Sequence, residues 1–153
     1  MTLEIRRAVV EDVEIVAAFN AAMARETEKL ELKPEVLLAG VTAVLADETK
    51  GYYFVAEHDG RVIGQAMITF EWSDWRHANF WWLQSVYVHQ EYRERGVFTS
   101  LYRHIFDESK AAGACGLRLY VEKENERARC AYERLGLRRA HYDLYEIDFV
   151  LGR

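Results

Sequence analysis

A strand that passes directly into a helix is the feature that most restricts the fold of this chain. Residues 86–102 read VYVHQEYRERGVFTSLY: apolar alternation gives way to a charged patch and one glycine, and helical spacing follows without a proline. Alternation indicates a strand buried on one face, and recurrence every three or four residues indicates an amphipathic helix. Such a handover predicts a mixed fold in which helices cover a sheet.

The same two periodicities predict the elements of the N-terminal half. They are a strand over Leu3–Val9, a helix with Val13, Val16, Asn20 and Met23 on one face, a second helix from Pro34 to near Asp47, and a hairpin turning at Asp59-Gly60. Proline suits the first turn of a helix, and Asp-Gly is a strong two-residue hairpin signal. The first half therefore supplies two helices and three strands.

The C-terminal half alternates strands and helices. The predicted elements are a fourth strand over Asn79–Val88, a helix from Val97 to Gly113, a fifth strand over Gly116–Glu124, a short helix between Asn125 and Gly136, and one or two strands over Leu137–Val150. Asn is a preferred N-cap, and Gly commonly follows a helix. We therefore expect an α/β (α+β) fold: a mixed, largely antiparallel sheet of six to seven strands with helices on both faces.

Length and composition limit the class of protein. A chain of 153 residues, 50% hydrophobic and without a linker or repeat, predicts one domain over residues 1–153. No apolar run reaches the roughly 20 residues that cross a bilayer, so we expect a cytoplasmic protein without a membrane partner. The net charge of −5 argues against a nucleic-acid partner. Cys115 and Cys130 lack metal-site spacing, so no metal is expected.

The charged patch has a physical interpretation of its own. A helix that follows a strand directly presents its unpaired N–H groups at the edge of the sheet, where they favour an anion. Arg93 and Arg95 add positive charge, and Gly96 permits close approach of the backbone or a positive φ. The patch thus predicts a phosphate-binding loop. The alternative is a turn glycine beside solvated arginines.

Two motifs carry a resemblance to a known family. YRERGVF after VYV, followed by NERARCAYERLGL, resembles the acetyl-CoA-binding motif and the downstream Asn…Tyr helix of the GNAT superfamily of N-acetyltransferases. Arg93, Gly96 and Phe98 fall on the family's Arg/Gln, Gly and Gly/Ala loop positions, so the third departs from the pattern. Asn125, Ala128, Tyr132 and Leu135-Gly136 match the second motif. The resemblance covers essentially the whole chain and implies that the fourth and fifth strands are splayed.

The resemblance also implies how acetyl-CoA, the acetyl donor, is held. The backbone of Val86, Tyr87 and Val88 would pair with the pantetheine arm, and Asn125 would contact the pantetheine region, also when it acts as a plain N-cap. Tyr132 would lie near the sulfur and protonate the departing thiolate; its alternative role is a core aromatic. The pyrophosphate would be held by Arg93 and by the N–H groups of Arg95, Gly96, Val97, Phe98 and Thr99.

The general base is the least determined residue. Parts of the family use a carboxylate on the fourth strand, and Trp82 occupies that place here. Glu71, at the end of the third strand, is our predicted base. Glu122 on the fifth strand, His89 or a relaying water are the alternatives, and each carboxylate has an ordinary surface role as its competing interpretation.

The acceptor side carries all four tryptophans of the chain within WSDWRHANFWW. Trp72 and Trp75 are predicted to line an acceptor pocket that binds an ammonium by cation–π contact. A homodimer contact or core packing is the alternative. Glu26 and Glu28, in the segment between the first two helices, would suit a cationic amine.

Three functions follow from these interpretations. The first is an N-acetyltransferase that moves the acetyl group of acetyl-CoA to the primary amine of a small molecule by direct attack on the thioester. The second is acetylation of a protein N-terminus or lysine, which would require an open groove across the sheet edge. The third is an acyl-CoA sensor without turnover, against which the presence of Tyr132 argues.

Overall fold

The computed structural model describes residues 1–152 and contains a five-stranded mixed sheet. The neighbours follow chain order: β1 (Glu4–Arg7), β2 (Tyr52–His58), β3 (Arg61–Ser73), β4 (Ala78–Val88) and β5 (Gly116–Leu119). The first four strands pair antiparallel, and β4 pairs with β5 in parallel. The predicted mixed, largely antiparallel sheet is confirmed.

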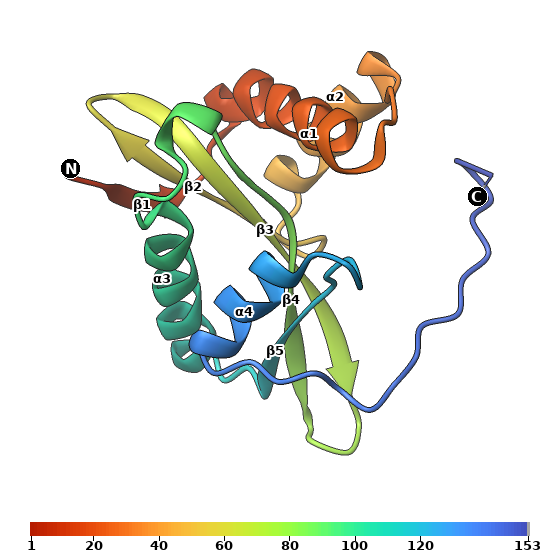
Figure 1. Ribbon diagram of the computed structural model, residues 1–153. Coiled ribbons are helices and arrows are strands. Elements are labelled where there is room, and N and C mark those ends of the chain that lie inside the picture. The colour runs from red at the N-terminus through yellow and green to blue at the C-terminus, as the bar shows by residue number, and fades with distance from the viewer. Residues whose placement is uncertain (153) are drawn as a thin grey trace. The chain divides into compact units, whose positions relative to one another are not determined.

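Helices cover both faces of this sheet, as Figure 1 shows. Helices α1 (Val13–Glu28) and α2 (Pro34–Ala46) lie on one face, and α3 (Val97–Ala111) lies on the other. Val55 of β2 packs in a core cluster with Val16 and Val41, whereas its neighbour Phe54 contacts His104 of α3. Successive side chains of a strand point to opposite faces. The run of buried residues along β2 is therefore the consequence of helices on both sides.

The predicted hairpin forms at the predicted turn. Asp59 and Gly60 have φ angles of 48° and 74°, and they connect the paired residues His58 and Arg61. Two consecutive left-handed residues are what a type I′ turn requires, and Asp-Gly tolerates them best. The register of β2 against β3 is thus set locally.

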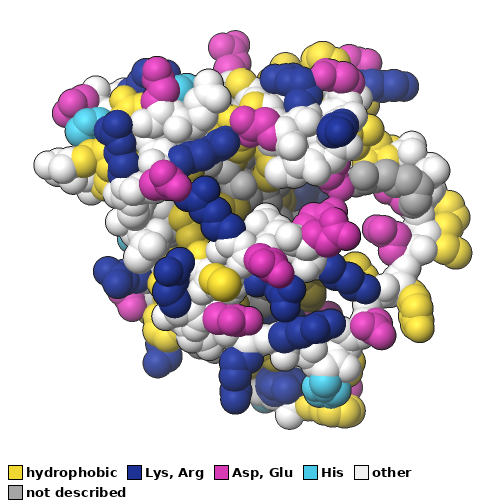
Figure 2. Space-filling view, in the orientation of Figure 1, with side chains coloured by type: hydrophobic (Ala, Val, Ile, Leu, Met, Phe, Trp, Pro, Cys, Tyr) yellow, Lys and Arg dark blue, Asp and Glu magenta, His cyan; other side chains and the backbone are white. Residues whose placement is uncertain are grey.

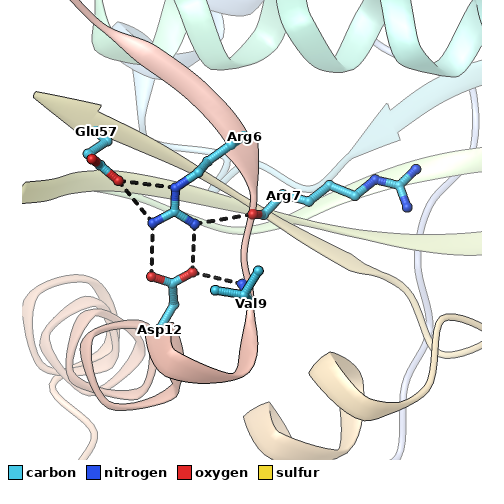
Figure 3. A network of polar contacts seen from close by, with 5 residues as sticks. All are labelled: Arg6, Arg7, Val9, Asp12 and Glu57. Atoms are coloured by element: carbon cyan, nitrogen blue, oxygen red, sulfur yellow. Dashed lines mark hydrogen bonds and ion pairs between the residues drawn. The ribbon is translucent and has the colours of Figure 1, made fainter. Parts of the chain in front are cut away.

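A polar network holds the chain between β1 and α1, through the short 3-10 helix η1 (Val10–Asp12) (Figure 3). Arg6 donates to both carboxylate oxygens of Asp12, at 2.8 and 3.1 Å, and from two nitrogens to Glu57 of β2, at 3.1 and 3.0 Å. Asp12 also accepts from the Val9 amide at 2.7 Å. These hydrogen bonds, led by that from Arg6, lower the pKa of Asp12 below its ordinary value.

The sheet has five strands, so the expected six to seven is wrong. The fifth strand ends at Leu119 instead of Glu124, which leaves Glu122 outside it. The segment 137–150 forms no strand, and several of its apolar side chains, such as Tyr145 and Phe149, are exposed. Alternation specifies which side chains would share a face, but a strand also needs a partner edge to satisfy its backbone.

The contacts divide the chain into two compact units, Met1–Tyr120 and the segment from Val121 onward. The sheet and α1 to α3 belong to the first unit. The second contains α4 (Glu126–Arg134), which begins and ends at the predicted residues: Asn125 caps it, and Gly136 follows with a φ of 96°. The single-domain expectation for residues 1–153 stays a prediction.

Two surface properties of the described residues bear on partners. No helix within residues 1–152 combines the length and the apolar character needed to cross a bilayer. In the face shown in Figure 2, dark blue Lys and Arg side chains are interspersed with magenta Asp and Glu side chains. The charge of this face is therefore mixed.

Candidate active site

The loop between β4 and α3 has the geometry of a tight strand-to-helix connection. After the short 3-10 helix η2 (Gln90–Tyr92), Gly96 adopts a φ of 79° and caps α3, and its carbonyl accepts the Ser100 amide at 3.0 Å. A Cβ added at Gly96 would meet nothing within 4 Å. There is therefore open space beside Gly96 at the N-terminus of α3, where the first N–H groups of the helix lack intrahelical partners.

Arg93 is anchored on both sides of its guanidinium. Its Nε donates to the Val88 carbonyl at 2.8 Å, and its Nη2 donates to both carboxylate oxygens of Glu26, at 3.0 and 3.3 Å. The guanidinium also lies 5.2 Å from the centroid of the Tyr87 ring. Burial, followed by the charge of Glu26, raises the pKa of Tyr87 above its ordinary value. The guanidinium of Arg93, in this loop, is therefore paired with the carboxylate of Glu26 in α1.

The β4 strand is bulged next to this loop. Its register against β3 shifts between Gln65 and Met67, and Ser85 adopts a φ of 49°. The pairing of β4 with β5 covers only Phe80–Leu83, so within the described residues no strand pairs with the other edge of Val86, Tyr87 and Val88. The edge of β4 away from β3 is therefore open to another strand beside Val86–Val88, although the Val88 carbonyl already accepts a hydrogen bond from Arg93 Nε. Pairing of this edge with a pantetheine arm stays a prediction.

Glu71, the predicted base, is engaged by two partners. Its carboxylate accepts a hydrogen bond from Arg118 of β5 and one from the Trp82 indole at 3.3 Å. The Arg118 guanidinium in turn lies 3.6 Å from the centroid of the Phe80 ring. Two donors thus hold the Glu71 carboxylate in place, and its role as the general base stays a prediction.

The tryptophans do not form one cluster. Trp81 is buried against Tyr52 and Phe70, with ring centroids 5.9 and 5.8 Å away. Trp82 points to the opposite face and lies 4.5 Å from Tyr120. Adjacent strand residues point to opposite faces, which explains the separation.

Trp72 and Trp75, the predicted acceptor residues, are exposed at the β3–β4 hairpin, with 58% and 86% of their surface accessible. Trp72 contacts His77 at a centroid distance of 5.6 Å. Glu28, at the end of α1, is exposed as well. Their roles in acceptor binding stay predictions.

Asn125 and Tyr132 lie in the second unit. The Asn125 side chain accepts the Ala128 amide at 3.1 Å, as an N-cap does. Tyr132 is half-buried, and burial raises its pKa above the ordinary 10.0. It therefore stays protonated at neutral pH, and a proton donor must be protonated to act. Its predicted position near the sulfur stays a prediction.

The sequence interpretation missed a buried polar group in the first unit. Asn20 of α1, Tyr53 of β2 and Gln65 of β3 form hydrogen bonds that reach the Ser85 carbonyl of β4. The sequence feature that could have indicated this group is Gln65, a polar amide within the otherwise apolar strand VIGQAMITF. Arg118, the partner of Glu71, was missed because its partner lies 47 positions away.

Comparisons with known proteins agree on one family. The model of the acetyltransferase (GNAT) family matches residues 16–137. A crystal structure described as a possible acetyltransferase from Clostridium difficile 630 is 44% identical, covers 98% of this chain and 99% of its own, and has a TM-score of 0.90.

Two further relatives define the range of similarity. The thialysine N-epsilon-acetyltransferase of Bos taurus is 32% identical over 75 residues, 49% of this chain; the matched part spans 44% of that relative's length. The ribosomal-protein-alanine N-acetyltransferase from Brucella melitensis biovar Abortus 2308 is 19% identical over 97% of this chain and 99% of its own, with a TM-score of 0.79. That last likeness shows the fold alone.

Proposed function

Because the chain belongs to the acetyltransferase (GNAT) family, we propose that it transfers the acetyl group of acetyl-CoA to the primary amine of a small, amino-acid-like molecule. The observation that carries the donor half of this proposal is the β4–α3 loop, where Arg93 and the left-handed Gly96 stand at the N-terminus of α3. A pyrophosphate is an anion of the kind that such a helix end favours.

The donor is expected to lie along β4 and end at this loop. The chain offers the N–H groups of Val97, Phe98 and Thr99 and the charges of Arg93 and Arg95 to the pyrophosphate, and the open edge of Val86–Val88 to the amides of the pantetheine arm. The side chain of Phe98 at the third motif position leaves the backbone donors in place. We therefore expect binding dominated by backbone contacts and two arginines.

The acceptor class rests on charge and on one relative. The bovine relative is named for the ε-amine of thialysine, a small amino-acid-like amine. On this chain, Glu71 and the exposed Trp72 and Trp75 offer a carboxylate and aromatic faces, which attract an ammonium. Arg118 beside Glu71 offers a cation to an acceptor carboxylate.

The chemistry needs two proton transfers. Acetyl-CoA supplies the thioester that the neutral amine attacks. An alkylamine with a pKa of about 10.4 costs roughly 4 to 5 kcal/mol to deprotonate at pH 7, so a proton acceptor is needed. Glu71 or an ordered water serves in that role, and Tyr132 protonates the thiolate that leaves.

Two alternatives remain for the same site. A protein N-terminus or lysine as acceptor needs an open groove that admits a peptide. A non-catalytic acyl-CoA sensor needs only the donor half of the site. The acceptor panel described next separates all three.

The test is release of free thiol from acetyl-CoA by the full chain in the presence of single amines. The panel contains free amino acids with a side-chain amine, simple alkylamines, and short peptides with a free N-terminus. Turnover with free amino acids and none with peptides supports the proposal. Turnover with peptides and none with free amino acids supports a protein N-terminus or lysine as the acceptor. Tight acetyl-CoA binding without turnover on any amine supports the non-catalytic acyl-CoA sensor.

A further inference from the structure

A hydrogen-bonded group of side chains lies beneath the bulge of β4; Asn20, Tyr53, Gln65 and Ser85 are called the bulge network below. Gln65 donates from Nε2 to the Asn20 Oδ1 at 2.8 Å and to the Ser85 carbonyl at 3.1 Å, and Asn20 donates from Nδ2 to the Tyr53 hydroxyl at 3.0 Å. The network joins α1, β2, β3 and β4. The hydrogen bonds of the network thus link these four elements to the bulge of β4.

The three side chains of the network are deeply buried, whereas Ser85 is half-buried. Gln65 is 0% exposed, Asn20 6% and Tyr53 4%. Among the described residues, Gln65 Oε1 is a buried side-chain atom without a hydrogen-bond partner. Burying an amide with one unpaired acceptor lowers stability, and an apolar side chain would avoid that loss. Core packing alone therefore does not explain why position 65 is a glutamine and not an apolar residue.

The bulge explains the amide. Ser85 has no partner residue in the β3–β4 register, and its φ of 49° is one that side chains other than glycine rarely adopt. A carbonyl that is taken out of the ladder and partly buried needs a donor. Gln65 is that donor, so it stabilises the left-handed residue and the extra residue of the strand together.

We propose that Gln65 is a positioning residue for acetyl transfer: by holding the Ser85 carbonyl it fixes the bulge and so directs the backbone N–H groups that the segment Val86–Val88 presents on the open edge of β4 toward the donor substrate. The inference rests on the proposed function, because that function places the thioester along this edge. A backbone donor stabilises a developing oxyanion only when it is held in place before the reaction.

The first test compares Gln65→Leu with Met67→Leu. Leucine removes both donors of Gln65, whereas Met67, the next residue on the same face of the strand, pairs with Tyr53 of β2, and its thioether has no donor to remove. Gln65→Leu is expected to lower kcat about tenfold or more with less than a threefold change in the Kd of acetyl-CoA. Met67→Leu is expected to keep both values. Equal kcat in the Gln65→Leu and wild-type proteins would overturn the inference.

Gln65→Glu provides a rescue that does not depend on how the leucine variant folds. A protonated carboxyl can donate to the Ser85 carbonyl and an ionised one cannot, and burial raises the pKa of a carboxyl. The kcat of Gln65→Glu relative to wild type at the same pH is expected to rise as pH falls. Tyr53 and Tyr87, the titratable neighbours, have pKa values raised above 10.0 by burial and stay neutral in that range. A ratio of the two kcat values that does not change with pH argues against the inference.

A measurement without turnover separates this inference from the proposed function. Backbone amide chemical shifts of Ser85–Val88 in the free protein are expected to move in Gln65→Leu and to stay in Met67→Leu. Unmoved shifts overturn the inference even when the wild-type enzyme is active. A wild-type protein that acetylates no amine overturns the proposed function, and the positioning role with it, whatever the shifts show.

Discussion

Arg93 donates from one nitrogen to both carboxylate oxygens of Glu26, at 3.0 and 3.3 Å, and so links the loop before α3 to the last turns of α1. The two residues are 67 positions apart in the chain. A pyrophosphate that binds this loop must share Arg93 with Glu26 or displace it. Both partners are partly exposed, so the ion pair contributes modestly, about 0.2 to 1 kcal/mol.

Removing the Glu26 charge should therefore strengthen donor binding. We expect Glu26→Gln to lower the Kd of acetyl-CoA by up to about fivefold at low ionic strength, by ending the competition for Arg93. Titration calorimetry of the Glu14→Gln variant, which removes an equal charge from the exposed start of α1, is the control. Weaker binding in Glu26→Gln would mean that the pair orders Arg93 for the ligand.

Gly96→Val should weaken acetyl-CoA binding at least tenfold, or about 1.4 kcal/mol, through both its left-handed φ and the side chain placed in the open space. Gly60 is a matched control, since it too has a left-handed φ, and a Cβ added there would meet nothing within 4 Å. Gly60→Val should lower the melting temperature, because valine is strained at a left-handed φ, but it should leave the affinity for acetyl-CoA unchanged. Equal affinities of both variants and wild type would remove the loop from the donor site.

Tyr132→Phe should lower kcat about tenfold or more and leave the Kd of acetyl-CoA unchanged, because it deletes only the hydroxyl. Burial raises the pKa of Tyr132 above 10.0, and a donor acts only while protonated. The contribution of Tyr132 is therefore present at neutral pH and lost as pH rises through a pKa above 10.0. A variant with wild-type kcat between pH 7 and 9 would assign Tyr132 to packing.

Asp12→Asn should destabilise the fold by about 1.5 to 3 kcal/mol at pH 7, the usual contribution of hydrogen bonds to charged groups. The pKa of Asp12 is lowered by its hydrogen bond to Arg6, so its stabilisation is complete above the ordinary value of 3.8 and declines as pH falls through the folded-state pKa. Urea unfolding should show the gap between wild type and variant narrowing at strongly acid pH. A constant gap would contradict the ion pair.

Trp72→Ala and Trp75→Ala should raise the KM for the acceptor from a few-fold to about thirtyfold and leave acetyl-CoA affinity alone, if these exposed rings contact the ammonium. A dimer contact predicts a different outcome. Sedimentation would then shift toward monomer with acceptor KM unchanged. Measuring both properties on the same two variants decides between the pocket and the homodimer.

Local patterns were sufficient for much of the fold. The Asp59-Gly60 turn, the capping Asn125 and the glycine before α3 were predicted correctly because each depends on the φ angles and hydrogen bonds of a few adjacent residues. Helical and strand periodicities likewise reflect which side chains share a face. The two motifs that indicated the family are continuous stretches of this kind.

The partners of side chains were decided by the tertiary structure. The engagement of Arg93 by Glu26, the pairing of Glu71 with Arg118 and the link from Gln65 to Ser85 join residues whose separation depends on strand register and helix placement. The alternation over 137–150 specified two faces but no partner edge, so the expected strands are absent there. Sequence by itself determined the helices, the β2–β3 hairpin and the donor motifs, because those are local. Only the folded chain determined which strands find a partner and which charges meet, because contact is a property of three-dimensional position.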